Sequence, residues 1–147
     1  MKVYLGADHA GFQLKELLRE SMKAAGHEVI DLGTFSEASV DYPDLAREVG
    51  EKVRENVETR GVLVCGTGIG VAIAANKLKG IRAANVHDVN EATLSRQHNN
   101  ANIVTVGART TDQKLAEEIV KTFLSTAFEG GRHQARIDKI TAIENEE

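Results

Sequence analysis

The sequence is short of the residues that cross-link a chain or carry it through a membrane. It contains one cysteine, Cys65, so no disulfide can form within the chain. It has one proline and no tryptophan. No apolar run approaches membrane-spanning length, and the apolar start at 1–6 is too short for a signal peptide. The net charge of -4 disfavours a general nucleic-acid binder. We therefore expect a cytoplasmic protein that binds neither nucleic acid nor membrane.

What is present is typical of one globular unit. The 147 residues are 41% hydrophobic and 27% charged, which suits a single domain over 1–147 with a sizeable core. Short apolar segments alternate with helical patterns along the chain. The expected strands are 3–7, 28–32, 62–65, 81–86 and 102–106, and a last helix is expected at about 132–144. The alternation predicts an α/β, Rossmann-like three-layer sandwich with a five-stranded parallel sheet.

A glycine-rich turn follows the third expected strand. The strand 62–65 is apolar throughout, as a strand covered on both faces requires, and it ends at Cys65. Gly66, Gly68 and Gly70 then lead, with Thr67 and Ile69 between them, into a short expected helix. Backbone N–H groups at such a turn form an anion-binding nest, and a thiol beside a helix N-terminus is suited to act as a base.

Two other interpretations of this turn stay open. A cysteine at a strand end is often a small buried hydrophobe. The glycines also suggest a dinucleotide loop, although their spacing is G-x-G-x-G and the dinucleotide motif needs G-x-G-x-x-G. A nucleotide P-loop is excluded at 6–11, because Gly11 is followed by Phe12 and Gln13 instead of lysine and serine or threonine.

Further polar residues fall at the ends of other expected strands. Asp8 and His9 follow the first strand, and Arg109 follows the fifth. Because parallel strands end at one edge of a sheet, these residues and the 65–70 turn should form one site. Asp8 could equally be a helix cap and His9 a surface residue. Tyr42, in an expected Tyr42-Pro43 turn, should lie near the same edge.

The chain carries a second group of candidates nearer its C-terminus. His98 lies in a polar break and could titrate near neutral pH. Arg132 and Arg136 follow a Gly130-Gly131 hinge and are four residues apart, so they share one helix face, where like charges repel unless an anion is bound. The hinge could let this helix reach a second copy of the chain. None of the histidines shows metal-ligand spacing with a carboxylate or with Cys65, so no metal is expected.

Taken together, the motifs resemble ribose-5-phosphate isomerase type B, a family that includes galactose-6-phosphate isomerase subunits. The resemblance covers nearly the whole chain in the family's order and spacing. The stretches that carry it are 6–11 (GADHAG), 40–43 (VDYP), 65–70 (CGTGIG), 74–77 (AANK), 80–82 (GIR), 95–99 (SRQHN) and 129–133 (EGGRH).

The resemblance implies a cofactor-free isomerase of sugar phosphates whose active site lies between two subunits of a homodimer or a dimer of dimers, with the C-terminal helix exchanged. By position, Cys65 would move the proton between C1 and C2, and His98 would assist ring opening. The N–H groups of 66–70, with Thr67, would hold the enediolate. Asp8 and Asn99 would bind sugar hydroxyls, and the phosphate would be held by His9, Arg109, Arg132 and Arg136.

One stretch departs from the family. Residues 83–92 lack the aromatic or serine residues expected between the fourth strand and its helix. The preference between a five-carbon and a six-carbon aldose phosphate therefore stays open. A sugar-phosphate-binding protein without activity is the alternative of another class, since a fold does not determine a function.

Overall fold

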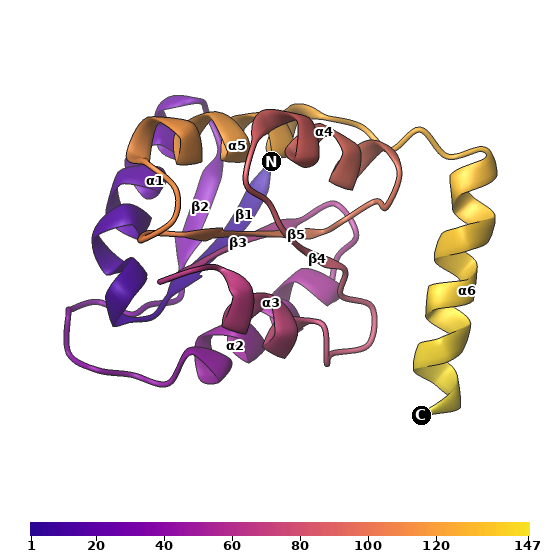
Figure 1. The fold of residues 1–147 in the computed structure, drawn as a ribbon, viewed down its shortest axis with the longest axis horizontal. Coiled ribbons are helices and arrows are strands. Elements are labelled where there is room, and N and C mark those ends of the chain that lie inside the picture. The colour runs from indigo at the N-terminus through magenta and orange to yellow at the C-terminus, as the bar shows by residue number, and fades with distance from the viewer.

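A computed structural model describes residues 1–147 as one α/β sandwich (Figure 1). Five strands form one parallel sheet in the order β2-β1-β3-β5-β4. The strands are β1 (Lys2–Ala7), β2 (Glu28–Asp31), β3 (Arg60–Cys65), β4 (Ala83–Asn85) and β5 (Ile103–Gly107). The helices are a 3-10 turn η1 (His9–Gly11), α1 (Phe12–Ala24), α2 (Tyr42–Arg54), α3 (Ile69–Ala75), α4 (Val89–Gln97), α5 (Gln113–Ser125) and α6 (Arg132–Glu146).

The helices cover both faces of the sheet. Figure 1 shows α1, α4 and α5 on one face and α2 and α3 on the other. The three central strands are apolar almost without interruption, because they are buried on both faces. The predicted fold class, a three-layer α/β sandwich with one five-stranded parallel sheet, is confirmed.

The strand order reverses between β1 and β3. From β1 the chain moves outward to β2 and then returns to pair β3 with the other side of β1. In open α/β sheets, ligands bind outside the carboxyl ends of the strands where the order reverses in this way. Asp8 follows β1 at this point, and the glycine-rich turn follows β3. The backbone N–H of Asp8 donates to the carbonyl of Val64 at 3.2 Å, so the two loops are tied together.

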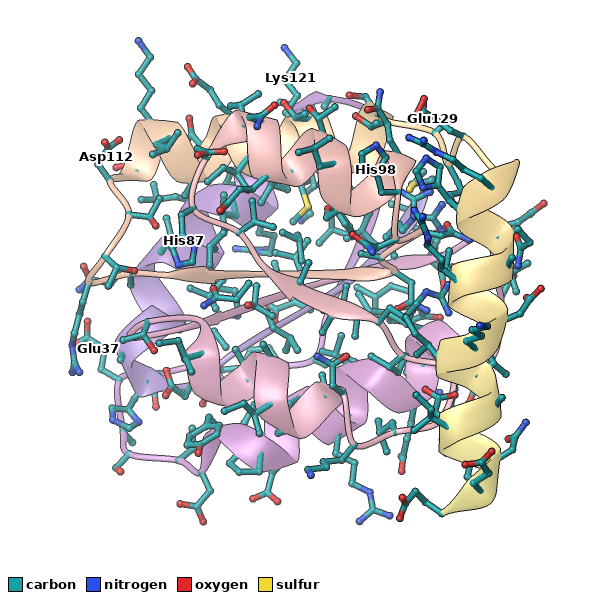
Figure 2. All side chains as sticks on the ribbon, turned by 45° about the vertical axis from the view of Figure 1, so that its right-hand side comes forward. Glu37, His87, His98, Asp112, Lys121 and Glu129 are labelled. Carbon is teal, nitrogen blue, oxygen red and sulfur yellow. The ribbon has the colours of Figure 1, made fainter.

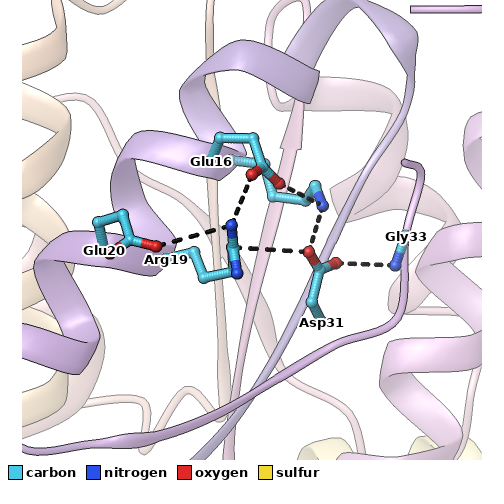
Figure 3. A network of polar contacts seen from close by, with 6 residues as sticks. Glu16, Arg19, Glu20, Asp31 and Gly33 are labelled. Atoms are coloured by element: carbon cyan, nitrogen blue, oxygen red, sulfur yellow. Dashed lines mark hydrogen bonds and ion pairs between the residues drawn. The ribbon is translucent and has the colours of Figure 1, made fainter. Parts of the chain in front are cut away.

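A largely buried ion pair supports the β1 side of this switch point (Figure 3). Lys15 of α1 is fully buried, and its ammonium lies 2.5 Å from Asp31 Oδ2 at the end of β2. The other carboxylate oxygen of Asp31 accepts a hydrogen bond from the N–H of Gly33 at 2.9 Å. The carbonyl of Gly33 in turn accepts from the N–H of Ala7 at 2.8 Å, one residue before Asp8. The pair therefore fixes the loop after β2 against the strand that presents Asp8.

The last helix stands away from the rest of the molecule (Figure 1). Gly130 and Gly131 precede it with φ of 68° and 55°, a left-handed conformation that favours glycine. Only His133 and Ile137 of α6 are buried, and near its end Glu144 Oε2 accepts from the N–H of Gly80 at 3.1 Å. No helix of the protein has the length and apolar character needed to cross a membrane.

Several local predictions are wrong. Tyr42-Pro43 is no separate turn but the start of α2, where proline is favoured because its missing N–H is not needed. Val57 continues the four-residue apolar spacing of Leu45, Val49 and Val53, which predicts that it belongs to this helix, but it lies beyond the end of α2 and is 89% exposed. The fourth strand has three residues instead of six, because it is an edge strand and the main chain of Arg82 bonds to Asn102 instead.

Candidate active site

The glycine-rich turn brings its backbone toward the cysteine sulfur. Cys65 is 5% exposed, and its Sγ accepts a hydrogen bond from the N–H of Gly68 at 3.1 Å. The N–H of Ile69 donates to Thr67 Oγ1 at 3.2 Å, and Thr67 and Ile69 are themselves exposed. Cys65 also packs in the apolar cluster under α2 and α3, as the small-hydrophobe interpretation expected. It is therefore a buried thiol with a backbone N–H donor, at the floor of an accessible turn.

Two of the glycines are required by the space around them. Gly68 has a φ of 78°, and a Cβ there would lie 2.6 Å from Asn85 Oδ1. A Cβ on Gly70 would lie 2.6 Å from the ring of Tyr42. The half-exposed Tyr42 therefore lies directly over the start of α3, which confirms that it belongs to this edge of the sheet.

The first strand contributes a buried carboxylate. Asp8 is 7% exposed, and its Oδ1 accepts from the N–H of Gly11 at 3.1 Å, so it caps the 3-10 turn. The cap interpretation is thus correct, and it uses one of the two carboxylate oxygens. The second oxygen has no protein partner in the hydrogen-bond network, which is compatible with binding a hydroxyl.

A groove of about 410 Å³ lies beside the turn and is lined by His9, Gln13, Glu37 and Arg109 among others. The Nδ1 of His9 accepts from the N–H of Val40 at 3.2 Å, which leaves Nε2 as the proton-bearing nitrogen of the neutral ring. The Arg109 side chain lies against Gly66, where a Cβ would meet its guanidinium at 3.1 Å. These contacts bring Asp8, His9, Tyr42, 65–70 and Arg109 to one edge, as predicted.

The remaining candidates form a second groove. It has about 290 Å³ and includes His98, Asn99, Arg132 and Arg136 in its lining. Asn99 and both arginines are exposed. Figure 2 shows His98 and Glu129 at the top of α6, whereas Glu37 of the first groove lies at the opposite end of the molecule. The two sets of predicted residues are thus on separate surfaces of one chain.

Two residues at the second groove were missed: His133, which lines it, and Glu129, which lies beside it. The ring of His133 stacks on that of His98, with centroids 4.3 Å apart, and Glu129 Oε1 lies 3.7 Å and 3.9 Å from the Nε2 atoms of His98 and His133. Burial and then the charges of His98 and Arg132 lower the pKa of His133. The signal in the sequence was the four-residue spacing of Glu129 and His133.

The same three residues are the one set that could hold a metal ion. The nearest ligand atoms of His98, Glu129 and His133 lie within 4.8 Å of one another. The expectation that no histidine has metal-ligand spacing with a carboxylate was therefore wrong. Arg132 and Arg136 border the same groove, however, and their positive charges favour an anion there over a cation.

Comparison with known proteins gives a consistent result. Residues 3–140 match the family described as Ribose/Galactose Isomerase. The chain is 46% identical to ribose-5-phosphate isomerase B of Escherichia coli, over 97% of this chain and 96% of the relative. It superposes on ribose-5-phosphate isomerase B of Clostridium thermocellum with a TM-score of 0.96, at 47% identity over 99% of both chains. For the Mycoplasma genitalium enzyme with bound ribulose-5-phosphate, the TM-score is 0.95 at 44% identity, over 99% of this chain and 97% of that one.

Proposed function

The chain belongs to the ribose/galactose isomerase family, and we propose that it interconverts ribose 5-phosphate and ribulose 5-phosphate without a cofactor. The relatives that span its full length include ribose-5-phosphate isomerases B, and one of them was solved with ribulose-5-phosphate bound. The conversion is an internal redox exchange, in which C1 is reduced as C2 is oxidised. It therefore requires a base, an acid and a site for negative charge, but no external oxidant or reductant.

In the proposed mechanism, Cys65 is the base. Its thiolate takes the proton from C2 of the open-chain aldose. The electron pair of that C–H bond forms a double bond between C1 and C2, and the π pair of the C1 carbonyl moves to its oxygen, which gives an enediolate. A proton is then returned to C1, while the hydroxyl proton of O2 is transferred to O1, so that O1 becomes a hydroxyl and O2 the carbonyl oxygen of the ketose. The observation that supports this role most directly is that the only cysteine lies at the end of β3 and accepts a hydrogen bond from the N–H of Gly68 at 3.1 Å. A backbone N–H aimed at the sulfur is a suitable partner for negative charge there.

The surrounding groups have matching roles. The N–H groups of 66–70 and Thr67 would stabilise the enediolate oxygens, as preorganised backbone dipoles do in other enzymes. Asp8 would bind a sugar hydroxyl with its free carboxylate oxygen, and His9 and Arg109 would hold the phosphate in the adjoining groove. Arginine and imidazole N–H groups are strong donors to phosphate.

The second groove of one chain would complete the active site around Cys65 of another chain. His98 would donate a proton for ring opening, Asn99 would bind a hydroxyl, and Arg132 and Arg136 would reach the phosphate. Because His98 lies at the opposite end of the molecule from Glu37 of the first groove, one chain would not bring both sets to one sugar in this conformation (Figure 2). A symmetric dimer would do so twice, each chain giving its first groove to one site and its second groove to the other.

The proposal is tested by incubating the protein with ribose 5-phosphate in D₂O. We expect ribulose 5-phosphate that carries deuterium at C1. Cys65→Ala and Cys65→Ser should each lower kcat by about 100-fold or more, as loss of a general base does, while calorimetric binding of ribose 5-phosphate stays near wild type. Ala75→Ser is the matched control, because it places a hydroxyl in the same buried cluster away from the turn. It should retain full activity.

The alternatives give different results in this assay. Turnover of allose or galactose 6-phosphate in preference to ribose 5-phosphate would identify a six-carbon isomerase. Binding without turnover of any of the three sugars would identify a binding protein. Near wild-type turnover by Cys65→Ala would show that Cys65 is not the base.

A further inference from the structure

A buried arginine that the proposed mechanism does not use lies two residues before His98 of the second groove. Arg96, in the last turn of α4, is 3% exposed and has no carboxylate within 4.0 Å. Burial, and then repulsion by Arg60 and Arg82, lower the pKa of Arg96 to about 10. A buried cation without a counter-ion is costly, so its position calls for an explanation.

The guanidinium is satisfied by acceptors from two segments. Its Nη1 donates to Asn100 Oδ1 at 2.8 Å and to the carbonyl of Ala101 at 2.7 Å. Its Nε donates to the carbonyl of Thr126 at 3.1 Å, and its guanidinium carbon lies 5.8 Å from the centre of the Phe123 ring. The turn after α4 and the segment that leads to α6 are therefore joined through one side chain.

The turn held in this way carries two residues of the second groove. His98 and Asn99 immediately precede Asn100, whose φ of 45° is unusual for a residue other than glycine. Arg82 holds the same turn from the other side, with its Nε 3.0 Å from the carbonyl of Asn99 and its Nη2 2.9 Å from that of Asn100. These bonds fix the direction in which the turn leaves α4.

The segment that Arg96 holds at Thr126 carries the other two predicted residues of the second groove, Arg132 and Arg136. It continues through Glu129, whose N–H donates to the carbonyl of Gln97 at 3.2 Å, into α6 with Arg132 and Arg136. The two glycines before α6 add flexibility, so a fixed point upstream of them matters for where the arginines lie. The planar guanidinium fork suits this task, since it donates in several directions at once, whereas a lysine ammonium is a single point charge.

We propose that Arg96 is a positioning residue that sets His98 and Asn99 in register with Arg132 and Arg136. This proposal rests on the proposed function, because it assigns Arg96 to the half of the shared site that one chain lends to the other. It accounts for a buried cation that has no carboxylate partner and bonds instead to the two segments that carry these residues.

Arg96→Lys is the test, with Arg60→Lys as the matched control. Lysine keeps the charge but cannot reach Thr126 and the Asn100 turn together. We expect kcat/KM for ribose 5-phosphate to fall by about 10- to 100-fold, the order that a displacement near 1 Å costs. Arg60 belongs to the same cluster of cations, but its Nη1 donates to the carbonyls of Val57 and Thr59, away from the turn. Arg60→Lys should therefore keep its activity, and unchanged kcat/KM in Arg96→Lys would overturn the proposal.

Mixing of chains separates positioning from general damage. Refolding Arg96→Lys with Cys65→Ala should restore activity, because one site of each mixed dimer then joins an intact Cys65 half to an intact His98 half. Refolding it with His98→Asn should restore none, because both changes affect the same half. If a chain with Arg96→Lys does not fold, Arg82→Lys is used in its place, since it releases the same turn.

The outcomes distinguish the two proposals. If Arg96→Lys damaged the whole chain, its own Cys65 groove would be defective as well. The mixture of Arg96→Lys with Cys65→Ala would then recover no activity, and this result would refute the positioning role. The pair Cys65→Ala and Arg136→Ala is mixed alongside. If that pair also fails to recover, the shared site of the proposed function is wrong, and the role of Arg96 falls with it.

Discussion

Gly107→Ala should move the 66–70 turn while leaving the fold in place. Gly107 ends β5 directly beside Cys65 in the sheet register. A Cβ at this position would lie 2.5 Å from the carbonyl carbon of Thr67 and 2.6 Å from its Cα, and it would also clash with Thr110 Oγ1. Ordinary contact begins at 3.4 Å, so the turn must retreat by about 0.9 Å, the difference between 3.4 and 2.5 Å.

The size of the effect follows from that displacement. A shift near 1 Å in a catalytic group costs about 100-fold in rate, and we expect this loss in kcat/KM for ribose 5-phosphate. Overpacking should cost about 1–3 kcal/mol of stability. For a chain of this length, each kcal/mol lowers Tm by about 2–4 °C. Steady-state kinetics and thermal denaturation monitored by circular dichroism measure the two effects separately.

Gly26→Ala is the control for this prediction. Gly26 has a φ of 92° and nothing within 4 Å of its added Cβ, so alanine there is strained but meets no neighbour. Its Tm should fall, at a cost of about 1–2 kcal/mol, with kinetics unchanged. If folded Gly107→Ala turns over substrate as fast as Gly26→Ala, the position of the 66–70 turn does not govern the reaction.

Three further predictions concern titration and catalysis. His98→Asn should slow turnover of cyclic ribose 5-phosphate more than proton exchange on the open-chain form, because only the former needs ring opening; equal losses in both assays would assign His98 another role. EDTA should leave activity unchanged, and a lasting loss restored by a divalent ion would point instead to the cluster of His98, Glu129 and His133. Burial and then the charge of the amino terminus lower the pKa of His27 from its ordinary 6.5, so the unfolded chain binds protons more readily. The stability linked to this shift is present above pH 6.5 and is lost on acidification. Tm of His27→Gln should therefore vary less between about pH 7 and 5 than Tm of wild type. An equal change of Tm with pH in both proteins would exclude His27 as a source of the pH-dependent stability.

The sheet, and the edge of it that carries the candidate site, could be predicted because local signals determine them. Apolar runs mark the central strands, and the residue after each strand falls at the same edge whatever the details of packing. Asp8, Cys65 and Arg109 were placed correctly for this reason. The short β4 was overestimated, because an edge strand is shaped by side-chain bonds such as that from Arg82 N–H to Asn102 Oδ1 at 2.8 Å.

The contacts behind the second groove could not be predicted, because they join distant segments. Arg96 and Thr126 are 30 residues apart, and an arginine in a helix ordinarily indicates a solvent-facing position. Lys15 was equally unforeseen as a fully buried residue, since its partner Asp31 lies on another element. Thr110 has capping-box spacing with Gln113, which predicts it as the cap of α5, but the cap is another residue for a more local reason. Asp112 is closer to the helix start, and its Oδ1 accepts from the N–H of Leu115 at 2.9 Å.

The central claim is that each active site joins Cys65 of one chain to Arg136 of another. Cys65→Ala and Arg136→Ala should each be nearly inactive alone, and co-refolding equal amounts should produce mixed dimers with one intact site each. With free mixing, half the dimers are mixed, so about a quarter of wild-type activity should return. No recovery, with mixed dimers shown by native mass spectrometry to be present, would contradict the shared site.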